Sequence, residues 1–227
     1  SSQYVSALMM IAPYMQKGLK IKLEGKIISL PYIRMTQKMM QNFGVKVDFE
    51  GQVIDIRPQS YQPIPYRIES DWSAASYWYE ILAISGKGKI ILKGLQQESM
   101  QGDSQVAEIF KELGVLTEYQ TDGVKLTPTG NSCKMLTYDF VGQPDLVQTV
   151  AVTCCLKNIP FHFKGVQSLK IKETDRVAAL IQELNKIGYV LTEPEEGELA
   201  WTGLTTNANN NQTTTILTYD DHRMAMA

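Results

Sequence analysis

A repeat of about seventy residues constrains the fold of this chain more than any other feature of its sequence. Three segments follow one order: a run with helical apolar spacing, a glycine, a strand-like run, a short turn and a second strand-like run. The glycines are Gly44, Gly114 and Gly188, spaced 70 and 74 residues apart. A glycine directly after a helical pattern commonly ends the helix in the left-handed conformation. The sequence therefore predicts three helices that each stop at a glycine and lead into a pair of strands.

The similarity continues upstream of these helices. A strand-like run with a glycine precedes each one, and Gly25, Gly94 and Gly165 are spaced 69 and 71 residues apart. Another apolar helix is predicted before each of those strands. Three further runs are candidate leading strands, at 66–69, 134–140 and 214–220. The unit then reads β-α-β-α-β-β, which is too large to be one rung of a stacked repeat protein. We expect an α/β protein in which several such modules pack around one another.

The most linker-like part of the sequence contains Pro58, Pro63 and Pro65. We place a domain crossing near 66–71, which separates residues 1–68 from residues 69–227. The chain begins within a predicted helix and closes on "DDHRMAMA", just where a further helix starts. Because both ends cut through an element, we expect the chain to be an internal part of a longer polypeptide.

Composition excludes several classes of function. A net charge of −2 gives no reason to expect nucleic acid or an anionic membrane as partner. No apolar run reaches the roughly 18 residues that span a bilayer. Two histidines make a His-rich metal site improbable. Cys133, Cys154 and Cys155 have no C-x-x-C spacing, and the last two lie in an apolar run. We therefore expect buried free thiols in a reducing, cytoplasmic setting.

Polar residues gather where the predicted helices begin. A helix start offers free backbone N–H groups, which either a capping side chain or a bound anion satisfies. For any single residue at these starts, capping is the favoured interpretation. Seven residues suit that role, namely Ser1, Ser2, Ser29, Asp71, Asp103, Asp145 and Thr174.

Three bases do not fit this interpretation. Lys172 and Arg176 precede or open a predicted helix, and Arg223 opens another. A base at this end opposes the helix dipole at a cost of about 0.3–1 kcal/mol. If both are helical, Lys172 and Arg176 share one face of the helix. These bases make sense where an anion binds, and Glu173 beside them suits proton transfer on an anionic substrate. The sequence has no P-loop, dinucleotide fingerprint, G-x-S-x-G or HExxH motif.

Six motifs together resemble the 5-enolpyruvylshikimate-3-phosphate synthase family in order and spacing. They are "SSQYVSALMMIAP", "SLPYI", "SDWSAASYW", "SMQGD", "IKETDR" and "DDHRMAMA", and the resemblance covers essentially the whole chain. It implies the enolpyruvyl transferase fold, of the inside-out α/β barrel type, with three β-α-β-α-β-β units in each of two domains. Residues 1–68 would then end the N-terminal domain, and residues 69–227 would form most of the second.

The resemblance also implies an activity. The family transfers the enolpyruvyl group of phosphoenolpyruvate to the 5-hydroxyl of shikimate 3-phosphate and releases phosphate, a step of the shikimate pathway to aromatic amino acids. It implies a monomer that acts on small molecules, with no metal and no organic cofactor. Two alternatives stay open, which are the related UDP-N-acetylglucosamine enolpyruvyl transferase and a non-catalytic phosphoanion-binding module of the same fold.

The site residues that the resemblance implies fall into two sets. Those that match the shikimate 3-phosphate site are Ser1, Ser2, Gln3, Ser29, Tyr32, Asp145, Ser168 and Lys172. Those that match the phosphoenolpyruvate site are Gln3, Arg176 and Arg223.

Three of these positions carry the implied chemistry. Asp145 matches the family's proposed general base, Glu173 the group that exchanges protons with the methylene carbon, and Lys172 a residue that contacts both substrates. Ser168 departs from the family pattern, because many relatives have asparagine there. The family's N-terminal lysine and arginines, and a lysine downstream of "DHRMAM", are not in this sequence. We therefore expect the isolated chain to be inactive.

Overall fold

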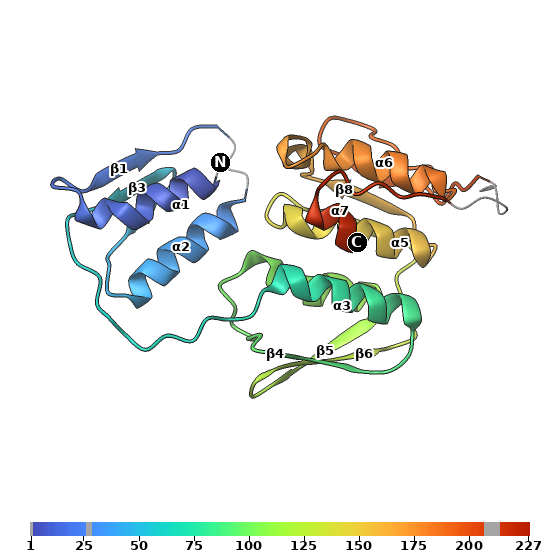
Figure 1. Cartoon of the computed structure of the whole chain (residues 1–227), viewed down its shortest axis with the longest axis horizontal. Coiled ribbons are helices and arrows are strands. Elements are labelled where there is room, and N and C mark those ends of the chain that lie inside the picture. Colours follow the sequence, from blue (N-terminus) through green and yellow to red (C-terminus); the bar gives the residue numbers. More distant parts are fainter. Residues whose placement is uncertain (1, 26–28, 207–213) are drawn as a thin grey trace. The chain divides into compact units, whose positions relative to one another are not determined.

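The computed structural model describes residues 2–25, 29–206 and 214–227. The chain divides into two compact units (Figure 1). The first unit contains Ser1–Glu69 and Glu98–Gly102, and the second contains Ser70–Gln97 and Asp103–Ala227. Each unit has its own cluster of buried apolar side chains.

The first unit is one module of the repeat. Its elements are α1 (Ser2–Ile11), the 3₁₀ turn η1 (Ala12–Tyr14), β1 (Leu19–Lys22), α2 (Leu30–Asn42), β2 (Asp48–Glu50) and β3 (Val53–Ile56). The strands form an antiparallel sheet in the order β1-β3-β2. Side chains alternate along β3, where Ile54 and Ile56 are fully buried. They pack with Met9 of α1 and with Ile33 and Met40 of α2 to form the core of this unit.

The second unit begins with a module of the same order. Its elements are α3 (Trp72–Ser85), β4 (Ile90–Lys93), η2 (Gly102–Gln105), α4 (Val106–Glu112), β5 (Val115–Gln120) and β6 (Gly123–Pro128). The sheet order is β4-β6-β5, again antiparallel and equivalent to that of the first module. α3 contacts all three of these strands and also packs against α4 and α5, so it is enclosed on several sides.

The third module is the one in which a leading strand forms. Its elements are β7 (Leu136–Asp139), η3 (Pro144–Leu146), α5 (Val147–Leu156), β8 (Phe161–Lys164), η4 (Gln167–Ile171), α6 (Arg176–Lys186) and β9 (Leu199–Trp201). β7 pairs parallel with β8, which pairs antiparallel with β9. The short helix α7 (His222–Met226) follows. The predicted strand at 134–140 is therefore confirmed as β7.

The glycines behave as the repeat predicts. Gly44, Gly114 and Gly188 follow α2, α4 and α6 with φ angles of 79°, 91° and 97°. Left-handed backbone is accessible to glycine at little cost because it has no Cβ. The local sequence thus ends these three helices in the same way.

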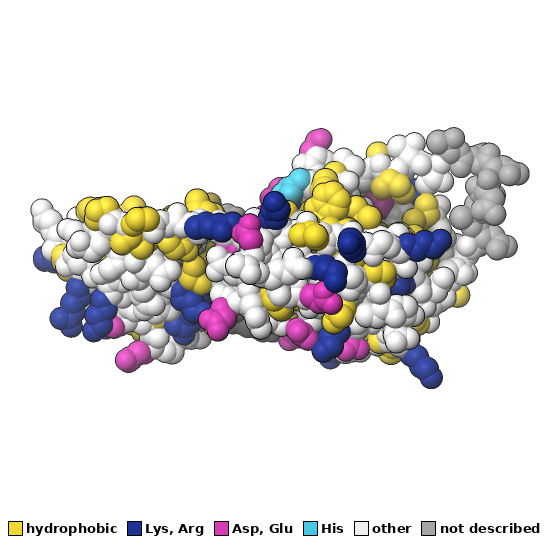
Figure 2. Space-filling view, turned by 90° about the horizontal axis from the view of Figure 1, so that it is seen from below, with side chains coloured by type: hydrophobic (Ala, Val, Ile, Leu, Met, Phe, Trp, Pro, Cys, Tyr) yellow, Lys and Arg dark blue, Asp and Glu magenta, His cyan; other side chains and the backbone are white. Residues whose placement is uncertain are grey.

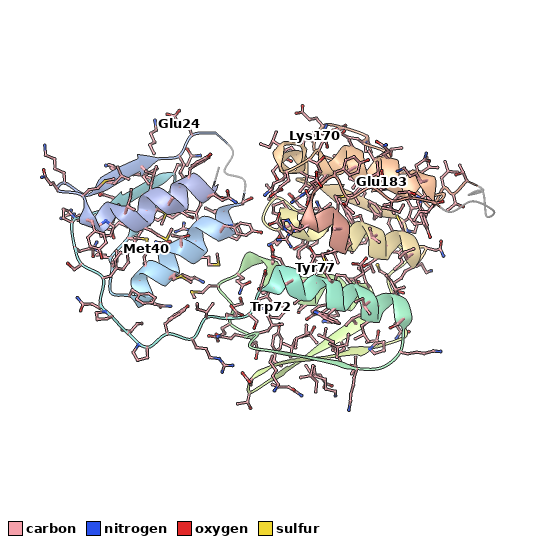
Figure 3. The ribbon with its side chains drawn as sticks, viewed as in Figure 1. Glu24, Met40, Trp72, Tyr77, Lys170 and Glu183 are labelled. Atoms are coloured by element: carbon pink, nitrogen blue, oxygen red, sulfur yellow. The ribbon has the colours of Figure 1, made fainter. Side chains whose placement is uncertain are left out.

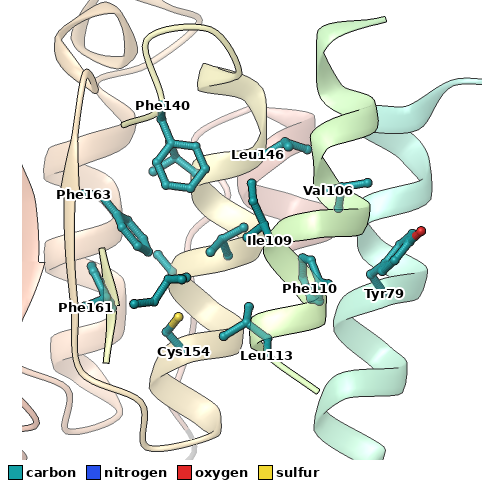
Figure 4. Close-up of a cluster of buried hydrophobic side chains, with 14 of the residues drawn as sticks. Tyr79, Val106, Ile109, Phe110, Leu113, Phe140, Leu146, Cys154, Phe161 and Phe163 are labelled. Atoms are coloured by element: carbon teal, nitrogen blue, oxygen red, sulfur yellow. The ribbon is translucent and has the colours of Figure 1, made fainter. Parts of the chain in front are cut away.

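The core of the second unit is built from helices that are apolar on most sides and from aromatic strand residues. On α5 nearly every side chain is buried, which is typical of a helix enclosed by its neighbours. Phe161 and Phe163 stack with ring centroids 4.2 Å apart, and Phe140 meets Phe163 edge-on at 4.9 Å. Cys154 lies in the same cluster (Figure 4). Cys154 and Cys155 are buried free cysteines, as the sequence predicts.

Two of the predicted leading strands are wrong. Residues 66–69 and 214–220 have no strand conformation. A strand persists only where a neighbouring strand satisfies its N–H and C=O groups. Beside the first run, the Ser70 N–H donates to the Gly94 carbonyl at 3.0 Å. In the second run, backbone groups of Thr215 and Leu217 bond to side chains of α6 instead of to a strand.

Acidic and basic side chains are interspersed on the face shown in Figure 2, in keeping with the near-balanced charge of the chain. Within the ranges that the structure describes, no helix has the length and apolar character needed to cross a membrane.

Candidate active site

A group of charged side chains meets in the second unit at the starts of three short segments. Pro144 opens η3 and is followed by Asp145. Asp175 caps α6 by accepting a hydrogen bond from the Ala178 N–H at 3.0 Å, which makes Arg176 the first residue of that helix. Asp221 caps α7 in the same way, accepting from the Arg223 N–H at 2.8 Å. Helix capping therefore fixes the backbone positions of both arginines, because it sets the residue at which each helix begins.

Arg176 is the centre of this group. Its side chain is only 2% exposed, so its charge requires partners within the protein. Nε and Nη2 donate to the two carboxylate oxygens of Asp221, at 2.7 and 3.1 Å. Nη2 also donates to Glu173 at 2.7 Å, and Nη1 donates to Asp145 at 3.3 Å. Every nitrogen of the guanidinium group thus faces a carboxylate.

Asp145 contacts three cations. Besides Arg176, its oxygens lie 3.3 Å from Nη2 of Arg223 and 3.6 Å from Nζ of Lys172. These contacts are longer than the bond between Arg176 and Asp221, and the Asp145 side chain is 18% exposed. Arg223 also donates to the hydroxyl of Tyr77 at 3.4 Å. Figure 3 shows Tyr77 on α3. Asp145 is therefore the shared counter-ion of the three bases.

The surroundings keep Arg223 and Asp221 charged. Burial opposes the charge of Arg223, but Asp145 and the Tyr77 hydroxyl outweigh it and raise the pKa of Arg223. Burial would raise the pKa of Asp221, yet the hydrogen bonds from Arg176 and from the Arg223 N–H leave the pKa of this carboxyl lowered. The group thus holds three cations against the carboxylates of Asp145, Glu173 and Asp221.

The structure corrects the sequence-based interpretation of how these bases meet. Lys172 does not share a helix face with Arg176, because it follows η4 in extended conformation and α6 begins only at Arg176. The two side chains meet through Asp145. Thr174 is not the cap of α6, since Asp175 takes that role. The base at this helix start is matched by carboxylates of the protein itself.

Three other predicted caps also differ from expectation. Asp145 lies inside the first turn of η3 and caps no helix. Asp103 is 2% exposed and accepts a hydrogen bond from the Ser73 hydroxyl. Ser29 precedes α2 but makes no capping hydrogen bond through its side chain. Asp71 does cap α3, accepting from the Ser73 N–H at 2.7 Å.

Two buried side chains of the second unit that are polar but carry no charge have no hydrogen-bond partner within the described part of the chain. Ser168 of η4 is 9% exposed, and its hydroxyl is one of them. The other is Gln148 of α5, whose amide oxygen and nitrogen are both unpartnered. Buried polar groups of this kind are usually satisfied by water or a ligand.

The remaining predicted residues belong to the first unit. Ser2 is the first residue of α1, and Gln3 follows it with an exposed side chain. Ser29 is 8% exposed and has a left-handed backbone with φ of 61°. Tyr32 lies in the first turn of α2 and is half-buried. Ser1 lies outside the described residues.

Asp221 and Tyr77 were not predicted as site residues. The motif "DDHR" contains a usable signal for Asp221, because an aspartate directly before a helix start is a common N-cap. No local signal marks Tyr77, which lies 146 residues from Arg223 in the sequence. Over the residues with described positions, no cluster of His, Cys, Asp and Glu could hold a metal ion.

Comparison with known proteins gives this geometry a context. The family model for EPSP synthase (3-phosphoshikimate 1-carboxyvinyltransferase) matches residues 1–227. A 3-phosphoshikimate 1-carboxyvinyltransferase of Bacteroides fragilis is 49% identical over 228 residues, covering 100% of this chain and 55% of the relative. The enzyme of that name from Idiomarina loihiensis is 35% identical and is covered over 52% of its length. The chain thus spans about half the length of the curated relatives it matches.

A solved structure of EPSP synthase from Acinetobacter baumannii has the same fold, with a TM-score of 0.68 at 16% identity. The alignment covers 100% of this chain and 52% of that one. These relatives agree with an α/β protein of separate three-stranded sheets, with no closed barrel among the described strands. The chain belongs to the EPSP synthase (3-phosphoshikimate 1-carboxyvinyltransferase) family.

Proposed function

We propose that this chain supplies part of an active site that transfers the enolpyruvyl group of phosphoenolpyruvate to the 5-hydroxyl of shikimate 3-phosphate, with release of phosphate. The observation that carries the proposal is that Lys172, Arg176 and Arg223 meet around Asp145. Glu173 also pairs with Arg176. The whole-length family match supports the choice of reaction.

In this proposal the arginines bind the phosphate and carboxylate of phosphoenolpyruvate. An arginine presents paired N–H donors that match such anions. Arg223 and Lys172 make only long contacts with Asp145, at 3.3 and 3.6 Å, so an anionic substrate competes for them easily. Their departure frees an oxygen of Asp145 to accept the proton of the acceptor hydroxyl. Glu173, whose side chain is 52% exposed, is accessible to exchange protons with the methylene carbon. Once protonated from solvent it would give a proton to this carbon on addition, and it would take one back when phosphate leaves.

We also assign residues to the binding of shikimate 3-phosphate, in each unit separately. From the second unit we assign Asp145, Ser168 and Lys172, and the unpartnered hydroxyl of Ser168 supports its role as a ligand contact. From the first unit we assign Ser1, Ser2, Gln3, Ser29 and Tyr32. The start of α2 supports this assignment, because the Ser29 side chain makes no capping hydrogen bond there. Gln3 would also reach phosphoenolpyruvate.

We further propose the arrangement of domains and the setting. Residues 1–68 would end the N-terminal enolpyruvyl transferase domain, and residues 69–227 would form most of the second. The division of the chain between Glu69 and Ser70 supports this boundary. The protein would work as a cytoplasmic monomer on small molecules, without a metal or organic cofactor.

Phosphate release with both substrates tests the proposal. The complete reading frame that encodes this chain should release phosphate, whereas the 227-residue chain alone should be nearly inactive. Asp145→Asn and Glu173→Gln should each lower kcat by about 10²–10⁴-fold, the usual range for losing a general acid or base. Glu118→Gln is the matched control, because Glu118 forms a surface pair with Lys125.

Three results would contradict the proposal. Turnover with UDP-N-acetylglucosamine in place of shikimate 3-phosphate would assign the site to the related transferase. Full activity of both acid variants would mean that neither carboxylate takes part in catalysis. The charged side chains of this chain would then serve only to bind a phosphoanion. Activity of the isolated chain at the rate of the complete protein would show that the site needs no other segment.

A further inference from the structure

The segment before α7 is held by one buried carboxylate that lies outside the charged group. Figure 3 shows this residue, Glu183, on α6. It is 3% exposed. Its Oε1 accepts from the Tyr219 hydroxyl at 2.6 Å, and its Oε2 accepts from the Leu217 N–H at 2.9 Å. Oε2 also accepts from Lys186 at 2.6 Å, and Lys186 donates to the Thr215 carbonyl at 3.2 Å. Residues 215–219 are thus fastened to α6 by Glu183, which holds Leu217 and Tyr219, and by Lys186, which Glu183 positions beside Thr215.

The turn that follows is strained. Tyr219 and Asp220 are consecutive residues with φ angles of 56° and 53°. Left-handed backbone is unfavourable for residues that carry a Cβ, and it persists only where the surroundings enforce it. The hydrogen bond from Tyr219 to Glu183 is such a restraint, and it raises the pKa of the tyrosine to about 12, with burial adding to the effect.

The strained turn determines where two functional groups lie. Asp221 comes directly after it, pairs with Arg176 and caps α7. Arg223 is two residues further on, and its side chain contacts Asp145. A change in the turn would therefore move the counter-ion of one arginine and the backbone of the other.

We propose that Glu183 is a positioning residue of the active site, which holds the turn at Tyr219 and Asp220 so that Asp221 and Arg223 meet Arg176 and Asp145. The expected effect on catalysis rests on the proposed function. The expected effect on the turn at Tyr219 and Asp220 does not. The chemistry of the reaction itself gives Glu183 no role, since none of its described contacts involves a residue of the charged group.

Two readouts test it, the first independent of activity. Amide hydrogen exchange of the 227-residue chain reports how firmly residues 214–221 are held. Glu183→Ala should speed exchange there at least about tenfold and leave α3 and α5 unchanged. The second readout is the steady-state kinetics of the protein encoded by the complete reading frame. Glu183→Ala should raise KM for phosphoenolpyruvate about tenfold and change kcat much less, because ground-state binding is what the arginines provide.

Matched variants separate positioning from general destabilisation. Glu198→Ala removes another mostly buried carboxylate of this unit, one that accepts from His162 and Lys164, so it should lower stability but not raise KM. Glu183→Gln keeps an oxygen acceptor and should restore part of the affinity. Tyr219→Phe leaves Glu183 in place and removes one hydrogen bond, so it provides the test if Glu183→Ala does not fold. It should raise KM about threefold.

Unchanged exchange at residues 214–221 in Glu183→Ala, or in Tyr219→Phe if the first does not fold, would overturn the anchoring role. Faster exchange with an unchanged KM would overturn the positioning role. An equal rise of KM in Glu198→Ala would show that the rise in Glu183→Ala comes from lower stability and not from a lost positioning role. Failure of the proposed function appears differently, as a wild-type protein that does not turn over phosphoenolpyruvate while exchange still responds to Glu183→Ala.

Discussion

At the scale of single residues, the second unit shows two opposite ways of burying a charge. Arg176 is almost fully buried, and the carboxylates of Asp221, Glu173 and Asp145 surround its guanidinium group. Removing one partner from such a group costs far more than removing a surface pair. Glu80 of α3 is also buried, at 5% exposure, yet it has no cation beside it and its Oε1 is unpartnered within the described residues. Burial alone raises the pKa of Glu80 to about 8.

We predict that Glu80 makes the chain less stable as the pH rises. Its pKa is about 8 in the folded chain and 4.5 ordinarily, so between these values only the unfolded chain releases the proton. The free energy of unfolding therefore falls from about pH 4.5 to about pH 8 and then levels off. Glu80→Gln should remove this slope and gain a few kcal/mol at pH 8.5 relative to pH 5.

Urea unfolding of both proteins at the two pH values measures this effect. Glu108→Gln is the control, because the Glu108 side chain is 71% exposed. A stability difference between wild type and Glu80→Gln that does not change with pH would contradict the prediction.

At the scale of elements, the join between β8 and η4 shows how a tight turn places the site. Gly165 follows β8 with φ of 74°, and η4 then leads to Lys172. A Cβ at this position would meet the carboxylate of Asp139 and the backbone N–H of Val141. Those two groups are themselves hydrogen-bonded at 3.0 Å, so the turn after β7 leaves no space there.

We predict that Gly165→Ala destabilises the chain by about 2–4 kcal/mol, since it adds this clash to the cost of left-handed backbone. Gly130→Ala is a matched control, because Gly130 has φ of 75° and a Cβ added there would meet nothing within 4 Å. The control should lose only about 1 kcal/mol. Urea denaturation measures both, and equal losses would show that the clash is relieved without cost.

At the scale of the whole molecule, the two units have separate cores. The core of the first unit is small and includes Met9, Met40 and Ile54, whereas that of the second is far larger. Small cores bury a smaller share of their surface and are correspondingly less stable. All three tryptophans, Trp72, Trp78 and Trp201, belong to the second unit.

We predict that the 227-residue chain unfolds in two steps in urea. Tryptophan fluorescence should follow the second unit alone, while far-ultraviolet circular dichroism should follow both and begin to change at lower urea. The methyl resonances of Met9 and Met40 provide an independent probe of the first unit. Coincident curves from all three measurements would mean that the units unfold together.

Local sequence patterns predicted much of this molecule because they act through the backbone of a few neighbouring residues. The glycine after each second helix was predictable in this way, and so were the strand pairs β2–β3 and β5–β6. After Gly188 the predicted pair is only partly formed, because β9 is the one strand there and Tyr189 and Thr192 make isolated bridges within the described residues. The sequence motifs also led to Asp145, Lys172, Glu173, Arg176 and Arg223, which the structure brings together. The roles of these five residues stay predictions, and so do those of Ser1, Ser2, Gln3, Ser29, Tyr32 and Ser168.

The tertiary structure decided what depends on distant partners. Whether 66–69 and 214–220 become strands depends on a neighbouring strand, and no such neighbour forms beside them in the described chain. Arg176 is matched by Asp221 from 45 residues away, and the turn before Asp221 is held by Glu183 across 36 residues. By itself the sequence determined the repeat and the residue types of the site, because helix periods and glycine turns are local. Only the folded chain determined which charges neutralise one another, because electrostatic pairing depends on distance in space and not along the chain.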